Sequence, residues 1–330
     1  MPRRTVLFLL LLAIGPAGCG GGSHSPSGPT TMPTPPGTSV TLVVFYDENA
    51  NGTADGTEVV RVPDVEVSVG GRTAKSEKLT GQAVVTGVQN GSYTVAIRNE
   101  TLPPFFQPGA PVSVTVPLGQ GSQIFVPLLL PIGRNIPNQY LAFGDSITRG
   151  DGSLTGGYPP RLQAKLSAHF GYADVRNRGA DATNSYEAVE RINNNNNLRN
   201  DAYALVLYGT NDWNIPECQD TPATCPTIAN LRLVLQRVKA SGTLPFIATL
   251  IPTNPAVNPG RNQWITTINA SIKALAQEQG AFLVDLYQAF QNQGGDLSRL
   301  FSDPVHPNDA GYDVIANGYF EAIAHGKAAP

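Results

Sequence analysis

The sequence predicts two folded parts in series: a small all-β domain, then an α/β domain built on a parallel sheet. Short apolar-alternating runs separated by Gly and Asn fill residues 38–131, which is typical of a β-sandwich. In residues 138–326, short apolar strands alternate with amphipathic helical stretches, and this alternation gives a parallel sheet with helices on both faces. Charged residues make up only 14% of the chain, against about 25% in ordinary soluble domains, so a long charged bundle or coiled coil is excluded.

Length and charge set further bounds. The 330 residues suffice for one large domain or two ordinary ones. The 22 Lys and Arg residues nearly balance the 25 Asp and Glu residues, and the sequence lacks the dense basic face that nucleic-acid binding needs. We therefore expect no nucleic-acid partner. The composition does not determine the oligomeric state.

The N-terminus predicts export. Residues 1–19 contain Arg3 and Arg4, followed by nine consecutive apolar residues at 6–14. That run is shorter than the roughly 20 residues that a membrane-spanning helix needs, which is typical of a signal peptide. Small residues directly before Cys19 resemble a bacterial lipobox, in which the Cys thiol is lipidated and becomes the mature N-terminus.

Two destinations stay open for the exported chain. Pro16 stands three places before Cys19, where the lipobox usually has Leu, so plain secretion is the alternative to a lipid anchor. Residues 20–37 carry ten Gly or Pro in eighteen positions, which indicates a flexible linker with little apolar surface to bury. We predict a membrane-anchored bacterial lipoprotein in the periplasm or at the cell surface, and otherwise a secreted protein.

Export also bears on the cysteines. An oxidising compartment favours disulfides, and lipidation of Cys19 leaves only Cys218 and Cys225, with six residues between them. We predict that these two pair, which closes a small loop and contributes somewhat under ~3 kcal/mol. A metal site fits less well because no His lies near them.

The expected strands of the β domain are short, and the clearest runs are 41–46, 65–69, 93–97 and 112–116. The segment Gly91-Ser92-Tyr93-Thr94-Val95, with Thr80-Gly81-Gln82 upstream, resembles the Gly-x-Tyr pattern of carboxypeptidase-regulatory-like and staphylococcal adhesin B-type domains. This resemblance implies a β-sandwich for residues 38–131.

One loop of this domain, residues 47–58, fits the calcium-binding pattern D-x-[DN]-x-[DN]-G-x₅-E at every fixed position. Alternate side chains of such a loop converge on one point, and calcium takes oxygen ligands. A strand is expected before the loop, and adhesin B-type domains are similar in placing such a loop after their first strand. The alternative is a turn-rich loop without an ion, because Asn, Asp and Gly also favour turns. The candidate ligands are Asp47, Asn49, Asn51, Thr53, Asp55 and Glu58.

The α/β domain follows the alternating pattern element by element. Strands are expected at 140–143, 204–208, 246–250 and 281–286, and helices at 158–170, 228–239, 264–277 and 310–324. In such folds the active site lies beyond the carboxyl ends of the strands.

Three motifs lie at these strand ends or before the last helix. They are Gly144-Asp145-Ser146, Gly209-Thr210-Asn211-Asp212 and Asp303-Pro304-Val305-His306. In this order and spacing they resemble the SGNH or GDSL-type serine hydrolases over most of residues 138–326. The resemblance implies a flavodoxin-like three-layer α/β/α fold and the hydrolysis of esters, as in esterases, lipases and carbohydrate deacetylases.

An acyl-transfer site needs a nucleophile, a base and a group that orients the base. Ser146 is the expected nucleophile, in a tight turn. Of the four His residues, three lie in the linker, at a helix end and near the C-terminus, so His306 is the expected base. Asp303, three residues before it, is expected to orient the imidazole. The alternative for Asp303 is a simple turn residue before Pro304.

The resemblance also implies an oxyanion hole made of the Ser146 backbone N–H, the Asn211 side-chain amide and a backbone N–H from a block Asn-x-Gly-x-x-Gly. In this chain the block is residues 177–182, and Ala182 replaces the last Gly, the usual donor. A backbone donor survives this replacement if φ is negative there. Gly179 is the second choice of donor.

We therefore expect an exported carboxylic ester hydrolase that needs no cofactor for catalysis and acts on an acylated carbohydrate or a lipid-like ester. Calcium is expected only in the β domain, and the membrane is a partner through the lipid anchor. The alternative is a surface-displayed protein that binds glycans or proteins on a catalytically weak SGNH scaffold, and Ala182 is its only support. The sequence leaves open the acyl chain length and the alcohol moiety.

Overall fold

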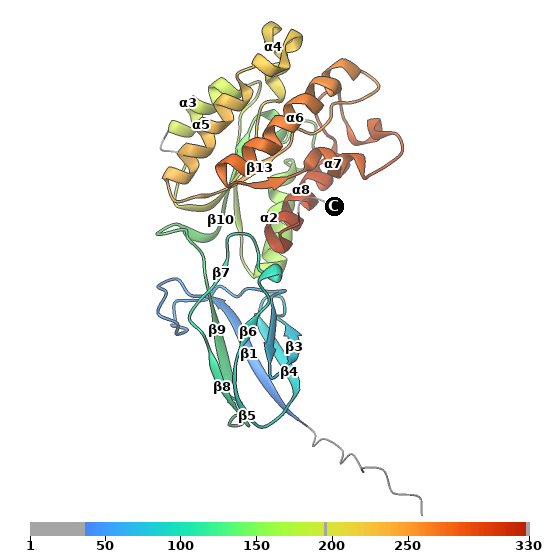
Figure 1. Ribbon diagram of the computed structural model, residues 1–330. Coiled ribbons are helices and arrows are strands. Elements are labelled where there is room, and N and C mark those ends of the chain that lie inside the picture. Colours follow the sequence, from blue (N-terminus) through green and yellow to red (C-terminus); the bar gives the residue numbers. More distant parts are fainter. Residues whose placement is uncertain (1–36, 195–196, 328–330) are drawn as a thin grey trace, which may run out of the picture. The chain divides into compact units, whose positions relative to one another are not determined.

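The structure is a computed structural model that describes residues 37–194 and 197–327 (Figure 1). The chain from Pro36 onward forms one compact unit. The predicted signal peptide, Cys19 and the linker up to Pro36 lie outside the described residues. Within the described ranges, no helix is both long enough and apolar enough to cross a membrane.

The first region is all-β, as predicted. Its strands pair in the orders β4-β1-β9-β7, β3-β2-β6 and β5-β8. The pairing of β1 with β9 is parallel, and the other pairings of these sheets are antiparallel. The strands are β1 (Thr38–Tyr46), β2 (Glu66–Val69), β3 (Arg72–Lys75), β4 (Gln82–Val88), β5 (Gly91–Thr94), β6 (Ala96–Ile97), β7 (Gln107–Pro108), β8 (Ser113–Val116) and β9 (Gln123–Leu129).

Period-two patterning explains the core of this region. Along β1, Val40 and Leu42 are fully buried, whereas Ser39 is exposed and Thr41 is only partly buried. Val67 on β2 and Val114 on β8 join the same hydrophobic cluster, so apolar faces of different sheets pack together. The run predicted as one strand at 93–97 is divided between β5 and β6, because β5 pairs with β8 whereas β6 pairs with β2.

The second region contains a five-stranded sheet in which every pairing is parallel, in the order β11-β10-β12-β13-β14. Numbered along this region alone, the order is 2-1-3-4-5, which is that of flavodoxin-like folds. The predicted α/β class is therefore confirmed. The strands are β10 (Ile136–Gly144), β11 (Asp174–Gly179), β12 (Asp201–Leu207), β13 (Leu244–Ala248) and β14 (Phe282–Val284).

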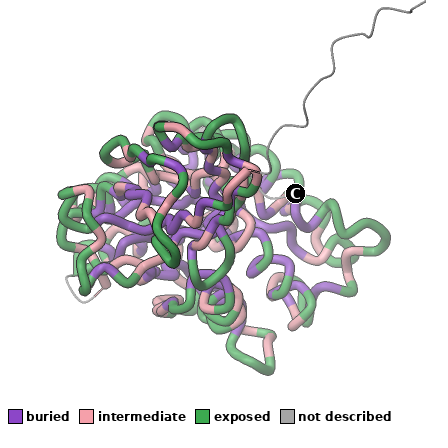
Figure 2. Tube along the Cα trace, turned by 90° about the horizontal axis from the view of Figure 1, so that it is seen from below, coloured by how far each residue is buried: buried purple, intermediate pink, exposed green. Residues whose placement is uncertain are grey.

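Helices cover both faces of this sheet. Because side chains alternate along β10, Leu141 and Phe143 join one hydrophobic cluster with α3, α5 and α6, and Tyr140 and Ala142 join another with α2, α7 and α8. Figure 2 shows the buried segments inside the trace and exposed residues on the outer loops. The helices are α1 (Ser146–Arg149), α2 (Tyr158–Phe170), α3 (Ser185–Asn193), α4 (Pro216–Asp220), α5 (Thr227–Ala240), α6 (Pro259–Gln279), α7 (Leu286–Gln291) and α8 (Asp309–His325).

Two element ends differ from the prediction because of capping side chains. The helix expected from residue 264 begins at Pro259, where the Asn258 side chain accepts a hydrogen bond from the Arg261 N–H at 3.2 Å. The strand expected at 281–286 ends at Val284, because the Asp285 side chain accepts from the Gln288 N–H and starts α7.

The two regions meet at a continuous junction. The cluster on the α2 and α8 side of the sheet extends into the β region. Phe105, from the β region, packs edge-on against Phe246 of β13 with ring centroids 5.6 Å apart. The Leu79 N–H donates to the carbonyl of His169, near the end of α2, at 3.3 Å. The domain boundaries at 131 and 138 stay predictions.

The predicted disulfide is confirmed. Cys218 on α4 is bonded to Cys225, just before α5. The Cys218 carbonyl also accepts a hydrogen bond of 2.8 Å from the indole N–H of Trp264 on α6. The disulfide and this hydrogen bond together hold the segment between β12 and α5 against α6.

Candidate active site

Ser146 lies at the carboxyl end of β10, where the strand turns directly into α1. Asp145 is the N-cap of this short helix, and its carboxylate accepts from the Ile147 N–H at 2.9 Å. Gly144 is required before it, because a Cβ at that position would lie 2.0 Å from Thr148 Oγ1 and 2.4 Å from the Leu207 carbonyl oxygen. The sequence thus places Ser146 as the first residue of a helix, with its hydroxyl at the sheet edge.

The structure brings Ser146, His306 and Asp303 into one hydrogen-bonded chain. Ser146 Oγ lies 2.9 Å from His306 Nε2, and His306 Nδ1 lies 2.7 Å from Asp303 Oδ2. Ser146 and His306 are 160 residues apart in sequence. The imidazole therefore contacts the hydroxyl through one nitrogen and the carboxylate through the other, which fixes its orientation.

The loop that carries Asp303 and His306 is stabilised by short local hydrogen bonds. Asp303 Oδ1 accepts from the backbone N–H groups of Val305 and His306, both at 2.7 Å. Ser302 N–H donates to the His306 carbonyl at 3.0 Å, and Asn308 caps α8 by accepting from the N–H groups of Ala310 and Gly311. Asp303 thus stabilises the turn, which was the alternative considered for it, and also contacts the His306 side chain.

These contacts also determine the charge of Asp303. Partial burial acts to raise the pKa of its carboxyl group, but the backbone N–H groups of His306 and Val305 and the His306 side chain together hold that pKa below its usual value. Asp303 is therefore an anion at neutral pH, which is the form that stabilises a protonated imidazole.

The donors expected at the oxyanion hole lie on three different segments. The Ser146 N–H belongs to the first turn of α1, where backbone donors have no partner within a helix. The Asn211 side chain follows β12, and one of its amide hydrogens is bonded to the Thr183 carbonyl at 3.0 Å, which leaves the other hydrogen. That bond holds Asn211 against the 180–184 loop, which includes Ala182.

Ala182 does not meet the condition set for it from the sequence. Its φ is +57°, in the left-handed region, whereas a negative φ was the condition for the backbone donor to survive the replacement of Gly. The N–H is retained, but the backbone adopts a conformation that favours Gly and costs Ala about 1 kcal/mol. The position at which this chain has Ala182 in place of the usual Gly is therefore also a position of local backbone strain beside the site.

Gly179 has a different role from the one considered for it. Its N–H donates to the Asn177 side chain at 2.9 Å, so this donor is already engaged. A Cβ on Gly179 would lie 2.0 Å from the Arg149 backbone nitrogen, so glycine is needed for β11 to pack against α1. We correct the second-choice assignment of Gly179 as an oxyanion donor for this reason.

The loop that carries Asn211 is held by two buried charged residues. Asp212 is fully buried and accepts from the Ser185 N–H at 2.8 Å and from the Thr227 hydroxyl, at the starts of α3 and α5. Burial raises the pKa of the Asp212 carboxyl group, although these hydrogen bonds oppose the shift. Arg261, also buried, donates to the Thr210 carbonyl at 2.5 Å.

Arg191 is a further residue of the site region that the sequence analysis missed. Its guanidinium, near the end of α3, donates to the carbonyls of Gly144 at 2.9 Å and Arg178 at 2.6 Å, and to the Tyr208 hydroxyl. The guanidinium carbon also lies 5.1 Å from the Phe143 ring centroid. Arg191 thus joins the ends of β10, β11 and β12, and no local sequence signal distinguishes it from other helix arginines.

Asp145 is a third carboxyl group near Ser146. Burial raises its pKa to about 7, while the hydrogen bond from Ile147 and the charges of His306 and Arg261 act in the opposite direction. Because Asp145 bonds to the backbone of α1, it stabilises the turn that carries Ser146.

The loop of residues 47–58, predicted to bind calcium, is held together by hydrogen bonds within the loop. Asp47 accepts from the Gly52 N–H at 2.8 Å, and Glu58 accepts from the N–H groups of Glu48 and Asp55, both at 2.9 Å. In the described part of the chain, one group of three side chains has potential metal-ligand atoms close to one another, and it does not include the carboxylates of this loop. The side chains are therefore in a hydrogen-bonded turn, and calcium binding stays a prediction.

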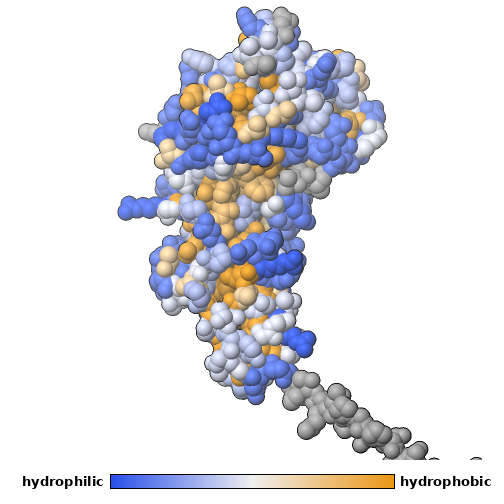
Figure 3. Space-filling view, viewed as in Figure 1, coloured by the Kyte–Doolittle hydropathy of each residue, from blue (hydrophilic) through white to orange (hydrophobic). Residues whose placement is uncertain are grey.

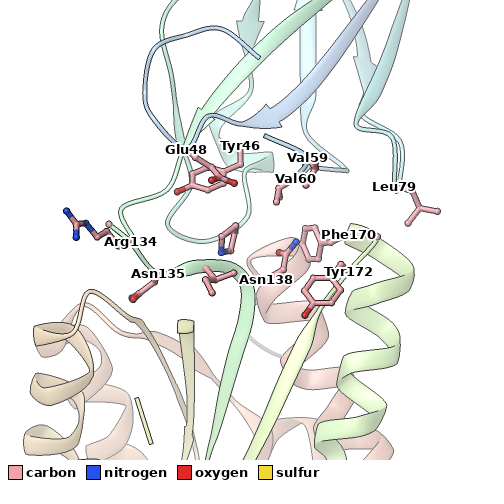
Figure 4. Close-up of a pocket in the computed structure, with 14 residues that line it drawn as sticks. Tyr46, Glu48, Val59, Val60, Leu79, Arg134, Asn135, Asn138, Phe170 and Tyr172 are labelled. Atoms are coloured by element: carbon pink, nitrogen blue, oxygen red, sulfur yellow. The ribbon is translucent and has the colours of Figure 1, made fainter. Parts of the chain in front are cut away.

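A cavity of about 660 Å³ lies at the junction of the two regions (Figure 4). Val59, Val60 and Tyr46 line it from the β region, and Phe170 and Tyr172 line it from the end of α2 and the residues after it. Figure 3 shows apolar surface on the visible face where the two regions meet. The described residues that line the cavity include none from the three motifs, so it is separate from Ser146.

The parallel sheet in the order 2-1-3-4-5 with helices on both faces defines the class of protein as α/β, and its carboxyl edge carries the hydrogen-bonded group of Ser146, His306 and Asp303. The sequence of residues 142–314 matches the GDSL-like Lipase/Acylhydrolase family. This match covers more than half of the chain, so the protein belongs to that family and is a carboxylic ester hydrolase. No curated protein matches the chain.

Solved structures similar to this chain include three esterases or related hydrolases. LAE5, an alpha/beta hydrolase from the metagenome of Lake Arreo, is 24% identical over 57% of this chain and 96% of its own, with a TM-score of 0.47. An acetylxylan esterase from Geobacillus stearothermophilus is 18% identical over 60% of this chain and 98% of its own, with a TM-score of 0.48. A lipase/acylhydrolase from Enterococcus faecalis is 20% identical over 57% of this chain and 95% of its own, with a TM-score of 0.47.

Proposed function

We propose that this ester hydrolase works through a covalent acyl-enzyme intermediate on Ser146, with His306 as general base and Asp303 as the residue that orients it. The observation that carries the proposal is the continuous hydrogen-bonded chain, 2.9 Å from Ser146 to His306 and 2.7 Å from His306 to Asp303. A serine hydroxyl is a weak nucleophile by itself, and a neighbouring base at this distance activates it.

The reaction proceeds in two halves. Ser146 Oγ attacks the ester carbonyl carbon while its proton passes to His306 Nε2, and a tetrahedral oxyanion forms. The intermediate collapses, His306 gives the proton to the departing alcohol, and the acyl group stays on Ser146. Water then attacks the acyl-enzyme as His306 takes a proton from it, and the carboxylic acid leaves as Ser146 regains its hydrogen. Asp303 stabilises the imidazolium in both halves without taking its proton.

In this proposal, the oxyanion is stabilised by the Ser146 N–H, the Ala182 N–H and the second amide hydrogen of Asn211. Removing one such donor typically costs about 10²- to 10³-fold in kcat. The Asn211 bond to the Thr183 carbonyl supports this assignment, because it fixes the amide next to the Ala182 loop. Side chains and backbone groups supply every proton transfer and charge contact of this scheme.

The place of action that we propose is outside the cytoplasm, on an acylated carbohydrate or a lipid-like ester. The signal-like residues 1–19 and the disulfide between Cys218 and Cys225 support export, since disulfides persist in oxidising compartments. Lipidation of Cys19 anchors the chain to the membrane in this proposal, and the linker at 20–37 separates the folded part from the lipid surface.

Hydrolysis of p-nitrophenyl esters, from acetate to palmitate, tests the mechanism and measures acyl length together. Ser146→Ala is expected to lower kcat by roughly 10⁴-fold or more, and His306→Ala by a similar factor. Ser113→Ala, on an exposed position of β8, is the matched control and retains full activity. Equal turnover by wild type and Ser146→Ala contradicts the assignment of the nucleophile. A folded wild type that cleaves no ester favours the binding-scaffold alternative.

A further inference from the structure

We propose that Asp64, His169 and His325 form a site for a divalent transition metal, with zinc as the ion that fits best. The three side chains come from different parts of the chain: a turn of the β region, the end of α2 and the last residue of α8. Their ligand atoms all lie within 4.8 Å of one another. The site is at the junction of the two regions and is separate from the Ser146 motif.

The spacing matches a tetrahedral ion. Zinc binds His nitrogen and carboxylate oxygen at about 2.0–2.1 Å, so neighbouring ligands of a tetrahedral ion are about 3.3 Å apart. Asp64 Oδ2 lies 3.6 Å from His169 Nε2 and 3.4 Å from His325 Nε2. Two of the three ligand pairs therefore already have nearly the required separation, and small side-chain movements bring the third to it.

His169 provides an independent sign that a ligand belongs here. Its side chain is 1% exposed, and among the residues that the structure describes neither ring nitrogen has a hydrogen-bond partner. A buried polar group without a partner costs about 1–3 kcal/mol, and native structures rarely tolerate one. A metal ion on Nε2 would satisfy this nitrogen, which points toward Asp64.

His325 is oriented in the way that metal-binding histidines usually are. Its Nδ1 lies 3.0 Å from Glu321 Oε2, one turn earlier on α8. This carboxylate fixes the tautomer with the proton on Nδ1, so Nε2 presents its lone pair toward Asp64. Carboxylate–histidine–metal arrangements of this kind orient the ring and raise its basicity as a ligand.

The surrounding charges permit a cation. Asp64 and Glu321 contribute two carboxylates, and the cations close to the group are Lys78, which acts on His169, and Lys327, whose Nζ lies 3.6 Å from Glu321 Oε2. Two imidazoles and one carboxylate suit zinc rather than calcium or magnesium, which take oxygen ligands.

The topology indicates what the metal does. Asp64 belongs to the β region, whereas both histidines end helices on one face of the parallel sheet. The Leu79 N–H already bonds to the His169 carbonyl at the same junction. An ion held by all three side chains joins the two regions and stabilises the folded state, by an amount that grows with the logarithm of the ratio of ion concentration to Kd. Three protein ligands leave a fourth position for water.

Metal analysis of the purified protein tests the site directly. After treatment with chelator, we expect wild type to take up stoichiometric zinc and to melt at a higher temperature with zinc than without. Cobalt in place of zinc should give the visible absorption bands of a four-coordinate ion. Asp64→Asn keeps the side-chain shape and tolerates the φ of +60° at this position, and it should weaken zinc binding roughly tenfold or more.

His325→Gln should weaken zinc binding to a similar extent, and both substituted positions are only partly buried, so folding is expected to persist. His24→Ala and His306→Ala are the matched controls, because they are the two histidines outside the group, and both should keep the zinc. Stoichiometric zinc that persists in both Asp64→Asn and His325→Gln overturns the proposal. A wild type that binds no zinc, or loses it equally in the controls, overturns it as well.

Discussion

The carboxyl edge of the parallel sheet and the junction with the β region both hold a histidine beside an aspartate, but the two environments differ. At the sheet edge, His306 contacts a partner through each ring nitrogen. At the junction, neither ring nitrogen of His169 has a hydrogen-bond partner among the described residues, although Asp64 Oδ2 lies 3.6 Å from its Nε2 and His169 is the more deeply buried of the two histidines. An imidazole with a hydrogen-bond partner on each nitrogen is held in one orientation, whereas a buried imidazole without hydrogen-bond partners leaves both of its nitrogens unsatisfied.

Among the substitutions at these two places, the largest effect is expected when Asp303 is replaced. Asp303→Asn keeps the side-chain volume but removes the charge that stabilises the His306 imidazolium and alters the tautomer that His306 adopts. We expect kcat on a p-nitrophenyl ester to fall by about 10²- to 10⁴-fold. Asp313→Asn, on the exposed side of α8, is the matched control and should leave kcat unchanged. A loss of less than tenfold would mean that Asp303 only supports the turn.

A smaller effect is expected at the junction, in the pH dependence of stability. In the unfolded chain His169 titrates near 6.5, whereas burial lowers its pKa to about 4 in the folded protein. Between these values the unfolded state binds more protons, so the free energy of unfolding decreases as the pH falls from about 6.5 to 4. The loss attributable to His169 is about 3 kcal/mol.

Urea unfolding at a series of pH values, in the presence of chelator, measures this effect. His169→Phe should flatten the pH dependence, because Phe170 and Phe320 provide an aromatic environment around the ring and the new side chain does not titrate. His24→Phe, outside the described residues, should leave the slope as in wild type. If both variants keep the wild-type slope, the acid sensitivity arises from another group.

The smallest expected effect concerns the strained residue beside the site. Ala182→Gly should raise the free energy of unfolding by up to about 1 kcal/mol, because Gly adopts a φ of +57° without the steric cost that Ala has there. Ala180→Gly, at a position whose φ is not positive, is the matched control and should lower stability by about 0.5–1 kcal/mol. Thermal and urea unfolding of the three proteins decide the outcome. A stability loss in Ala182→Gly would show that the strain does not limit the fold.

Sequence patterns predicted the two fold classes and many of the elements, and they also selected the three side chains that form the hydrogen-bonded chain. The apolar runs gave strands and helices whose ends are mostly within a few residues of those found, and the exceptions at α6 and α7 follow from the capping side chains of Asn258 and Asp285. Asp303 and His306 are three residues apart, so a single loop holds both. Local physical rules act over such distances, which is why the contact between these two side chains was foreseeable from the sequence, while their catalytic roles stay predictions.

The sequence by itself determined the alternation of strands and helices, the position of Ser146 in its turn and the Asp303–His306 pair, because each depends on neighbours in the chain. Only the tertiary structure decided the rest. Arg191 contacts three strand ends, and Asp64, His169 and His325 meet at one point. Both arrangements depend on segments distant in sequence. His169 was set aside as the end of a helix and His325 as a residue near the C-terminus, and packing of α2 beside α8 brings the two together. Such encounters are properties of the packed core, and no local pattern in the chain encodes them.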